Sequence, residues 1–231
     1  MILIDGKKVA ADIRSELKDK ISQLKAEGKN VPGLVAIIVG EDPASQIYVA
    51  SKGKACEEIG MRTKTEKLSA DISEAELLTL IQSYNQNKDY HGILVQLPLP
   101  KHINEDKVIE TISHKKDVDG FHPISVGNLV IGKDTFASCT PAGIQELLIR
   151  YKIETKGKHV VVVGRSNIVG KPIANIMLQK AEGANSIVTI VHSAAKDISY
   201  YTKQADILIA AIGKAEMIKA DMVKDGVAVI D

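Results

Sequence analysis

Apolar residues along this chain follow two alternating patterns, one with the period of a helix and one typical of a buried strand. Over residues 8–28 the apolar positions recur at helical spacing, which predicts a helix. Residues 34–39 read Leu-Val-Ala-Ile-Ile-Val. Such a continuous apolar run is expected of a strand that is buried on both faces.

These two patterns repeat along most of the chain. Further strands are predicted at residues 63–68, 92–97, 158–163, 186–191, 207–211 and 227–230. Further helices are predicted at residues 45–59, 73–87, 104–112, 140–150 and 171–180. The residues up to Asp5 indicate a short strand and a turn, and Ser73 and Glu76 have the spacing of a capping box. Repeated β-α units with helical crossovers predict an α/β fold with mainly parallel sheets, formed twice over.

The pattern also indicates where the chain divides and how it ends. It is least regular near residues 136–141, which predicts an N-terminal domain of residues 1–139 and a C-terminal domain of residues 140–231. The sequence stops at Asp231, directly after an apolar stretch typical of a strand. Because a buried strand makes a poor natural terminus, we expect further residues to follow in the full protein.

Composition excludes several classes of function. The formal net charge of +1 gives no overall basic field to attract nucleic acid, and aromatic residues, at 3%, are too few for base-stacking platforms. Cys56 and Cys139 form no CxxC or Cys/His cluster, so we expect no metal site. No signal peptide is evident, and no apolar run approaches the ~20 residues that span a bilayer. We therefore expect a cytoplasmic protein with no membrane partner.

The loop after the strand at residues 158–163 is the first candidate site, because ligands bind beyond the carboxyl ends of parallel strands. Gly164 ends the strand and Gly170 opens the next helix, a spacing that matches neither G-x-G-x-x-G nor a P-loop. A helix N-terminus attracts anions. Arg165 and Ser166 add a cation and a hydroxyl that suit a 2′-phosphate, which favours NADP over NAD. A turn that binds nothing fits the spacing about equally well.

Polar residues at two other positions are candidates for binding. Gln96 follows an apolar strand and precedes a proline-rich turn, where its amide offers a donor and an acceptor. Asp117 and Asp119 precede Gly120 in a loop that lacks the remaining ligands of a calcium-binding EF-hand. An Asp beside a glycine turn either binds a pair of ligand N–H groups or caps the turn. The sequence leaves both open.

Tyr48 and Lys52 share a face of the helix predicted at residues 45–59, one turn apart. Short-chain dehydrogenases use a Tyr-x-x-x-Lys pair, but there the pair follows the nucleotide-binding turn. Here it lies well before Gly164, so that interpretation fails on order. Taken alone, Lys52 also fits a solvated helix face, since its neighbours are surface-like: Lys54, Glu57 and Glu58.

The order of four motifs is more specific than any one of them. They are Tyr48-x3-Lys52, Val95-Gln-Leu-Pro-Leu-Pro100, Asp117-Val-Asp-Gly120 and Gly164-Arg-Ser-x-x-Val-Gly-x-Pro172. With them the chain closely resembles the bifunctional methylenetetrahydrofolate dehydrogenase/methenyltetrahydrofolate cyclohydrolase family, over essentially its whole length. The resemblance implies a homodimer of two-domain α/β subunits. It also implies a Rossmann-like, NADP-binding second domain and an active site in the cleft between the domains.

The resemblance implies the activity and the role of each site residue. The activity is NADP-dependent oxidation of 5,10-methylenetetrahydrofolate to 5,10-methenyltetrahydrofolate, followed by hydrolysis to 10-formyltetrahydrofolate. Lys52 is implied as the catalytic lysine, hydrogen-bonded and tuned by Gln96. Tyr48 is implied to stack on the aminobenzoate ring, and Asp119 to hold the pterin. The implied folate site also includes Ser45, Val95 and Leu97, and the implied NADP site comprises Gly164, Arg165, Ser166, Gly170 and Ser193.

Two alternatives remain. A single-activity relative would keep only the dehydrogenase, although the presence of both Lys52 and Gln96 argues against it. A non-catalytic nucleotide-binding module would use only residues 164–170. One departure from the family also stands out. The family continues past the strand that ends here at Asp231, through a Gly-Ile-Asn turn to a Pro-Gly-Gly-Val-Gly-Pro segment, and this sequence contains neither.

Overall fold

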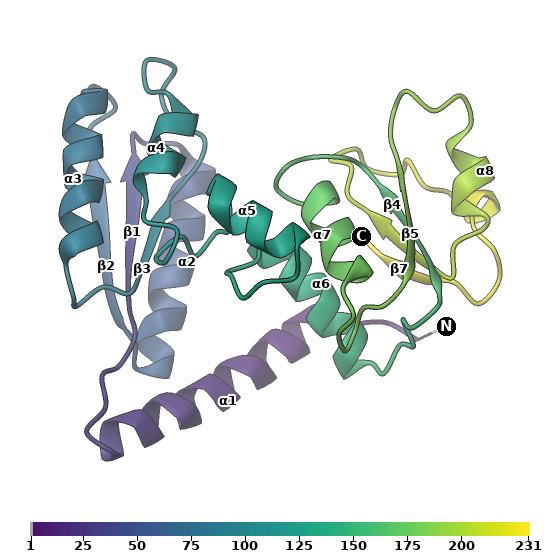
Figure 1. The fold of residues 1–231 in the computed structure, drawn as a ribbon, viewed down its shortest axis with the longest axis horizontal. Helices are drawn as coiled ribbons and strands as arrows, with labels where there is room; N and C mark the ends of the chain where they lie inside the picture. The colour runs from purple at the N-terminus through teal and green to yellow at the C-terminus, as the bar shows by residue number, and fades with distance from the viewer. Residues whose placement is uncertain (1) are drawn as a thin grey trace. The chain divides into compact units, whose positions relative to one another are not determined.

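The computed structural model describes residues 2–231, which form two compact units (Figure 1). The N-terminal unit is Asp5–Ile124, and the C-terminal unit joins the residues up to Ile4 to Ser125–Asp231. Each unit contains a parallel β-sheet with helices on both faces. This confirms the predicted α/β class with two domains.

The N-terminal unit is built on a three-stranded parallel sheet in the order β2-β1-β3. Its strands are β1 (Gly33–Val39), β2 (Arg62–Leu68) and β3 (Gly92–Val95). Its helices are α1 (Gly6–Ala26), α2 (Pro43–Ile59), α3 (Glu74–Gln86) and α4 (Glu105–Thr111), and α5 (Pro123–Val130) begins at its last residues.

The central strand β1 is buried on both faces, as its apolar run predicts. Ile37 packs with Leu77 and Ile81 of α3 on one face of the sheet, and Ile38 packs with Val49 of α2 on the other. These side chains are at most 3% exposed. Burying a side chain of this size stabilises the fold by about 1.5–3 kcal/mol, so alternate positions of one strand hold two helices in place.

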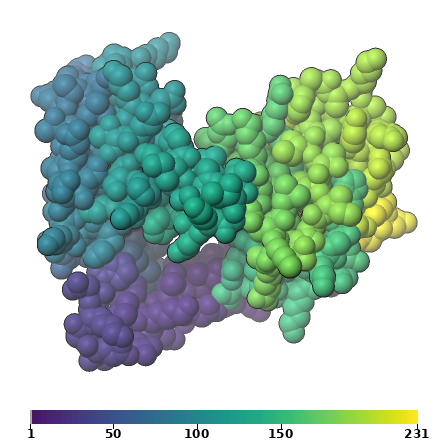
Figure 2. Space-filling model, viewed as in Figure 1, coloured from purple at the N-terminus to yellow at the C-terminus, as the bar shows by residue number. Residues whose placement is uncertain are grey.

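Local signals determine where the helices of this unit begin and end. Ser73 caps α3, and Glu76 completes the predicted capping box by accepting from the Ser73 backbone N–H at 3.0 Å. Helix α2 ends at Gly60 in the left-handed conformation, with φ 84°. Helix α1 buries only Val9 and Ile21, and Figure 2 accordingly shows its purple atoms at the surface.

The C-terminal unit is built on a four-stranded parallel sheet in the order β5-β4-β6-β7. Its strands are β4 (His159–Val163), β5 (Ile187–Val191), β6 (Ile207–Ala210) and β7 (Ala228–Ile230). Its helices are α6 (Cys139–Arg150), α7 (Gly170–Leu178), α8 (Ile198–Thr202) and the single 3-10 turn η1 (Ala220–Met222).

The core of the C-terminal unit also lies on both faces of its sheet. Val160 and Val162 of β4 pack against α6 and α7, with Met177 among their partners, whereas Val161 and Val163 pack in the cluster on the face that α8 covers. All five side chains are 0% exposed. The β4 run of four valines is therefore a doubly buried strand, which is the Rossmann-like arrangement expected for this half of the chain.

Each helix and strand predicted from residue 8 onward has a counterpart, but three short elements were not predicted: α5, α8 and η1. Helix α5 starts at a proline and contains Gly127, and α8 has only five residues, so neither gives a clear helical period. The short strand predicted before Asp5 is wrong, because residues 2–5 pair with no strand. Ile2 and Leu3 are 84% and 80% exposed, and residues 2–5 form no strand.

The contacts divide the chain after Ile124, whereas the sequence pattern places the boundary after residue 139. The difference concerns α5 and the loop that follows it. Leu129 and Ala137 pack against the core of the C-terminal unit, which draws this segment into that unit although it precedes α6. The domain boundary at residues 139/140 stays a prediction from the sequence pattern. The division at residues 124/125 is the one that the contacts in the structure give.

No helix within residues 2–231 combines the length and the apolar character needed to cross a lipid bilayer.

Candidate active site

The predicted site residues lie at equivalent places in the two sheets. In the N-terminal unit the chain passes from central β1 to β2 on one side and then to β3 on the other; in the C-terminal unit β4, β5 and β6 repeat this order. In parallel sheets ligands bind where the strand order reverses, beyond the carboxyl ends of the strands. In the N-terminal unit, the start of α2 follows the carboxyl end of β1 and the Gln96 turn follows that of β3. In the C-terminal unit, residues 164–170 follow the carboxyl end of β4.

Three residues separate the end of β1 from the start of α2, and the first turn of α2 is closed by capping. Asp42 accepts a hydrogen bond from the Ser45 backbone N–H at 2.8 Å, and Pro43 occupies the first helical position. Contact with Ser45 keeps the pKa of the Asp42 carboxyl below its ordinary value. Ser45 is only 5% exposed, so the predicted site begins on a rigid helix terminus.

Lys52 and Gln96 meet across the sheet from α2 and from the end of β3. The Lys52 Nζ lies 3.5 Å from Gln96 Oε1, at the outer limit of a hydrogen bond. Gln96 is itself fixed, because its Nε2 donates to the Leu97 carbonyl at 2.8 Å and its backbone N–H donates to the Ile37 carbonyl at 2.9 Å. The amide oxygen is therefore held toward the lysine.

Asp119 is the third polar group of this cluster. Burial raises the pKa of Asp119 to about 6, the positive charge of Lys52 opposes this rise, and the negative charge of Asp117 adds to it. The lysine and the carboxylate are thus close enough to interact electrostatically. Asp117 is 2% exposed and accepts from the His122 backbone N–H at 2.9 Å. Lys52, Gln96 and Asp119 come from three separate elements of one unit.

The other residues predicted for the folate site lie in different surroundings. Tyr48 is 63% exposed on the outer face of α2, one turn before Lys52, so its ring is available to stack on a ligand. Val95 is 5% exposed and packs within the core, which leaves only its backbone for a ligand. Leu97 is half-buried, in the turn that carries the Gln96 amide.

Gly164 and Gly170 are explained by close packing of the backbone. A Cβ on Gly164 would lie 2.2 Å from the Ala211 carbonyl oxygen, and Gly164 has φ +125°. A Cβ on Gly170 would lie 2.4 Å from the Gly164 carbonyl oxygen. The two glycines therefore let the start of α7, the end of β4 and the end of β6 meet, and no other residue fits there.

The loop after Gly164 presents backbone donors. Among the described residues, the N–H groups of residues 165–168 have no hydrogen-bond acceptor. The first N–H groups of α7 are in contrast already used: Ser166 Oγ accepts from Val169 at 3.0 Å and from Gly170 at 3.3 Å, and the Lys171 N–H donates to the Ser166 carbonyl at 3.0 Å. An anion would therefore meet the loop N–H groups before the helix terminus.

Side chains around this loop fit a phosphorylated cofactor. Arg165 is exposed beside the free N–H groups, and the Ser166 hydroxyl keeps its O–H available to donate. Ser193 is exposed in the loop after β5, which pairs with β4 so that Val191 lies opposite Val163. The loops after β4 and β5 therefore both start at the carboxyl end of the same sheet. The residues present fit a dinucleotide with an anionic ribose substituent.

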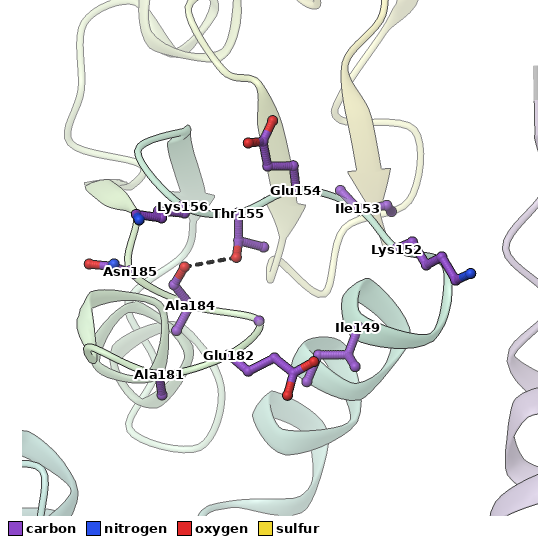
Figure 3. A pocket seen from close by; sticks show the side chains of 11 residues that line it. Ile149, Lys152, Ile153, Glu154, Thr155, Lys156, Ala181, Glu182, Ala184 and Asn185 are labelled. Atoms are coloured by element: carbon purple, nitrogen blue, oxygen red, sulfur yellow. Dashed lines mark hydrogen bonds between the residues drawn. The ribbon is translucent and has the colours of Figure 1, made fainter.

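A cavity of about 400 Å³ also lies in the C-terminal unit, but none of the predicted site residues lines it. It lies between the loop that follows α6 and the loop that follows α7, before β4 and β5 begin (Figure 3). The Thr155 hydroxyl donates to the Ala184 carbonyl at 2.7 Å, and Figure 3 shows Lys152 and Glu154 pointing away from the centre. Without convergent polar groups the cavity lacks the usual form of a small-molecule site.

The sequence interpretation missed features that depend on the fold. It left open whether an Asp of the Asp117–Gly120 motif binds a ligand or caps the turn, and the structure places the Asp117 side chain in a buried backbone contact. It did not identify the donors at residues 167 and 168, since a backbone N–H has no signal in the sequence. No group of three or more His, Cys, Asp or Glu side chains within residues 2–231 is arranged to hold a metal ion.

Comparison with protein families covers most of the chain. Residues 4–119 match the family described as "Tetrahydrofolate dehydrogenase/cyclohydrolase, catalytic domain". Residues 138–231 match the family described as "Tetrahydrofolate dehydrogenase/cyclohydrolase, NAD(P)-binding domain". The first range contains the Lys52 cluster, and the second contains residues 164–170.

Individual relatives agree with these matches. The chain is 59% identical to the "Bifunctional protein FolD" of Chloroherpeton thalassium, over 100% of this chain and 79% of that protein. The crystal structure of the bifunctional enzyme FolD from Campylobacter jejuni is 48% identical, with a TM-score of 0.95, over 100% of this chain and 80% of that one. The Trypanosoma brucei enzyme, solved with NADP cofactor and inhibitor, is 34% identical, with a TM-score of 0.91, over 99% and 77% of the two chains.

Proposed function

The chain belongs to the tetrahydrofolate dehydrogenase/cyclohydrolase family, and from this premise we propose how its own residues carry out the two reactions. It is a bifunctional enzyme of one-carbon metabolism. With NADP it oxidises 5,10-methylenetetrahydrofolate to 5,10-methenyltetrahydrofolate, which it then hydrolyses to 10-formyltetrahydrofolate. The observation that carries the assignment of residues is the meeting of Lys52, Gln96 and Asp119 in one cluster.

Lys52 moves the protons of the hydrolysis. Water adds to the electrophilic methenyl carbon and loses a proton, and one C–N bond then breaks while its nitrogen gains a proton. As an ammonium Lys52 gives such a proton and as a free amine it takes one, and its Nζ lies 3.5 Å from the Gln96 amide oxygen and interacts electrostatically with Asp119. Gln96 orients the lysine by offering its fixed Oε1. An arginine would not replace Lys52, because it stays charged.

Asp119 and Tyr48 hold the folate. The Asp119 carboxylate accepts from adjacent N–H groups of the pterin, a pairing that needs its charged form. Because the pKa of Asp119 is raised to about 6, the charged form predominates at pH 7 and is lost below about pH 6. The exposed Tyr48 ring provides a stacking surface for the aminobenzoate group. Ser45 and the backbone near Val95 and Leu97 complete the site.

Residues of the C-terminal unit bind the cofactor. When bound, NADP accepts the hydride from the methylene carbon of the folate. The free N–H groups of residues 165–168 suit its diphosphate, and Arg165, Ser166 and Ser193 suit its 2′-phosphate. Gly164 and Gly170 maintain the backbone on which these groups lie. We also propose that the enzyme works in the cytoplasm and that it is a homodimer. Sedimentation of the purified protein tests the oligomeric state.

The assay that tests this function measures both reactions of one preparation. Formation of NADPH from 5,10-methylenetetrahydrofolate is followed with NADP and with NAD side by side, and loss of added 5,10-methenyltetrahydrofolate is followed separately. We expect both activities, with a lower KM for NADP than for NAD. Turnover of the methylene substrate without hydrolysis of the methenyl substrate would leave only a dehydrogenase and would remove the role of Lys52.

A further inference from the structure

We propose that Asp117 is a positioning residue of the folate site: its carboxylate closes the loop that carries Asp119 and so fixes Asp119 for the substrate. The proposal rests on the function proposed above, in which Asp119 holds the pterin. Asp117 acts without touching the substrate, because it is 2% exposed and its carboxylate contacts backbone.

One end of the loop is anchored on the sheet. Asp117 forms an isolated parallel bridge with Ile93 of β3, and the Ile93 N–H donates to the Lys116 carbonyl at 2.8 Å. This contact extends the edge of the sheet by one residue. The start of the loop therefore has the rigidity of β3, the strand that also leads to Gln96.

The other end of the loop returns to Asp117. The Gly120 N–H donates to the Asp117 carbonyl at 3.3 Å, with Gly120 in the left-handed conformation, and the His122 N–H donates to Asp117 Oδ2 at 2.9 Å. Main chain and side chain of Asp117 thus bind the loop at two successive points. Asp119 lies between Asp117 and the first of these points, so its backbone has little freedom while Asp117 stays bonded.

The charge of Asp117 has a second effect on its neighbour. The charged groups that act on Asp119 are Lys52 of α2, which favours its ionised form, and Asp117, which disfavours it. The other titratable side chains of residues 114–122 are His114, Lys115, Lys116 and His122. The two imidazole ring centroids are 5.9 Å apart, and Lys116 Nζ donates to the Tyr84 and Asn87 carbonyls at 2.8 and 2.6 Å. Replacing the Asp117 carboxylate by an amide keeps an oxygen for the His122 N–H and removes the charge. The two effects are therefore separable.

Two variants of Asp117 test the proposal through the folate KM and the pH profile of kcat/KM. For Asp117→Ala we expect a folate KM about tenfold higher with an unchanged NADP KM, because the His122 N–H loses its acceptor. For Asp117→Asn we expect a folate KM within about threefold of the wild-type value, and an acid limb of the profile moved to lower pH. Asp106→Asn removes an exposed carboxylate from α4 and serves as the matched control.

Each other outcome contradicts the proposal. A wild-type folate KM for Asp117→Ala, or equal losses for Asp117→Ala and Asp117→Asn, would overturn the positioning role. An Asp117→Ala protein that also loses NADP binding would show general damage to the fold and would overturn it as well. An Asp117→Asn profile with an unmoved acid limb would remove the electrostatic part. An Asp119→Ala variant separates the two levels: if it leaves the folate KM unchanged, the proposed role of Asp119 fails whatever Asp117 does.

Discussion

The two candidate sites of this chain are built from different materials. In the N-terminal unit the site consists of side chains, since Lys52, Gln96 and Asp119 come from α2, the end of β3 and a loop. In the C-terminal unit it consists mainly of backbone, since residues 165–168 present free N–H groups between two glycines. Proton transfer needs groups that titrate, whereas binding a diphosphate needs only fixed dipoles. The carboxyl end of the sheet thus serves catalysis in the N-terminal unit and cofactor binding in the C-terminal unit.

The largest effect should come from removing the titrating group of the side-chain site. For Lys52→Met we expect cyclohydrolase activity to fall by at least about 100-fold, because general acid-base catalysis contributes about 10²–10⁴-fold. Dehydrogenase activity should fall less, and the NADP KM should stay unchanged. Both rates are measured on one preparation, with Lys54→Met as the control, since Lys54 is exposed on the same helix. Unchanged cyclohydrolase activity would exclude Lys52 from the proton transfer.

The backbone site should be sensitive to a single methyl group. For Gly164→Ala we expect a loss of about 2–4 kcal/mol in the stability of the C-terminal unit and loss of NADP binding, because the Cβ would overlap the Ala211 carbonyl and φ is +125°. Thermal unfolding and NADP titration measure the two effects. Gly143→Ala is the control: its Cβ has open space in α6, so a gain of about 0.5–1 kcal/mol is expected. Wild-type NADP affinity in Gly164→Ala would contradict the backbone account.

The buried Asp119 carboxylate of the side-chain site should reduce the stability of the folded protein at neutral pH. Because the pKa of Asp119 is raised to about 6 in the folded state, the folded chain binds a proton more readily than the unfolded chain. The contribution of Asp119 to stability should therefore fall as pH rises from about 4 to about 6, and stay lower above that range. Asp119→Asn should lack this dependence and be more stable at pH 7 by up to about 3 kcal/mol. Urea unfolding at pH 4, 5, 6 and 7 measures it, and parallel curves for both proteins would contradict the shift.

The sequence predicted the sheets better than it predicted the site. Runs such as residues 34–39 and 158–163 contain their own evidence, because a doubly buried strand needs an apolar residue at each position. Lys52 has no such signal, since its surroundings on α2 are those of a surface lysine. Its partners, Gln96 and Asp119, are distant in sequence and come near it only through the parallel order β2-β1-β3. The family resemblance, and not the spacing of residues, supplied their roles.

The backbone site was only half predictable for a related reason. The glycine spacing identified the loop after β4, and the expectation that the start of α7 would receive an anion followed from helix geometry. In the structure Ser166 already uses the first N–H groups of that helix, and the free donors lie before it. Which N–H groups stay free depends on the turn at residues 166–169, and several sequences form the same turn.

The smallest expected effect concerns the one charged side chain of the backbone site. If the N–H groups bind the diphosphate and Arg165 pairs with the 2′-phosphate, Arg165→Gln should raise the NADP KM about tenfold and leave the NAD KM unchanged, because NAD lacks that phosphate. The salt dependence of NADP binding should decrease with it, since an exposed ion pair is screened. Arg62→Gln is the control, removing an exposed arginine that pairs with Asp89 at 2.5 Å. An equal rise in the KM for NADP and for NAD would instead assign Arg165 to the diphosphate. It would also mean that the loop N–H groups do not bind the diphosphate by themselves.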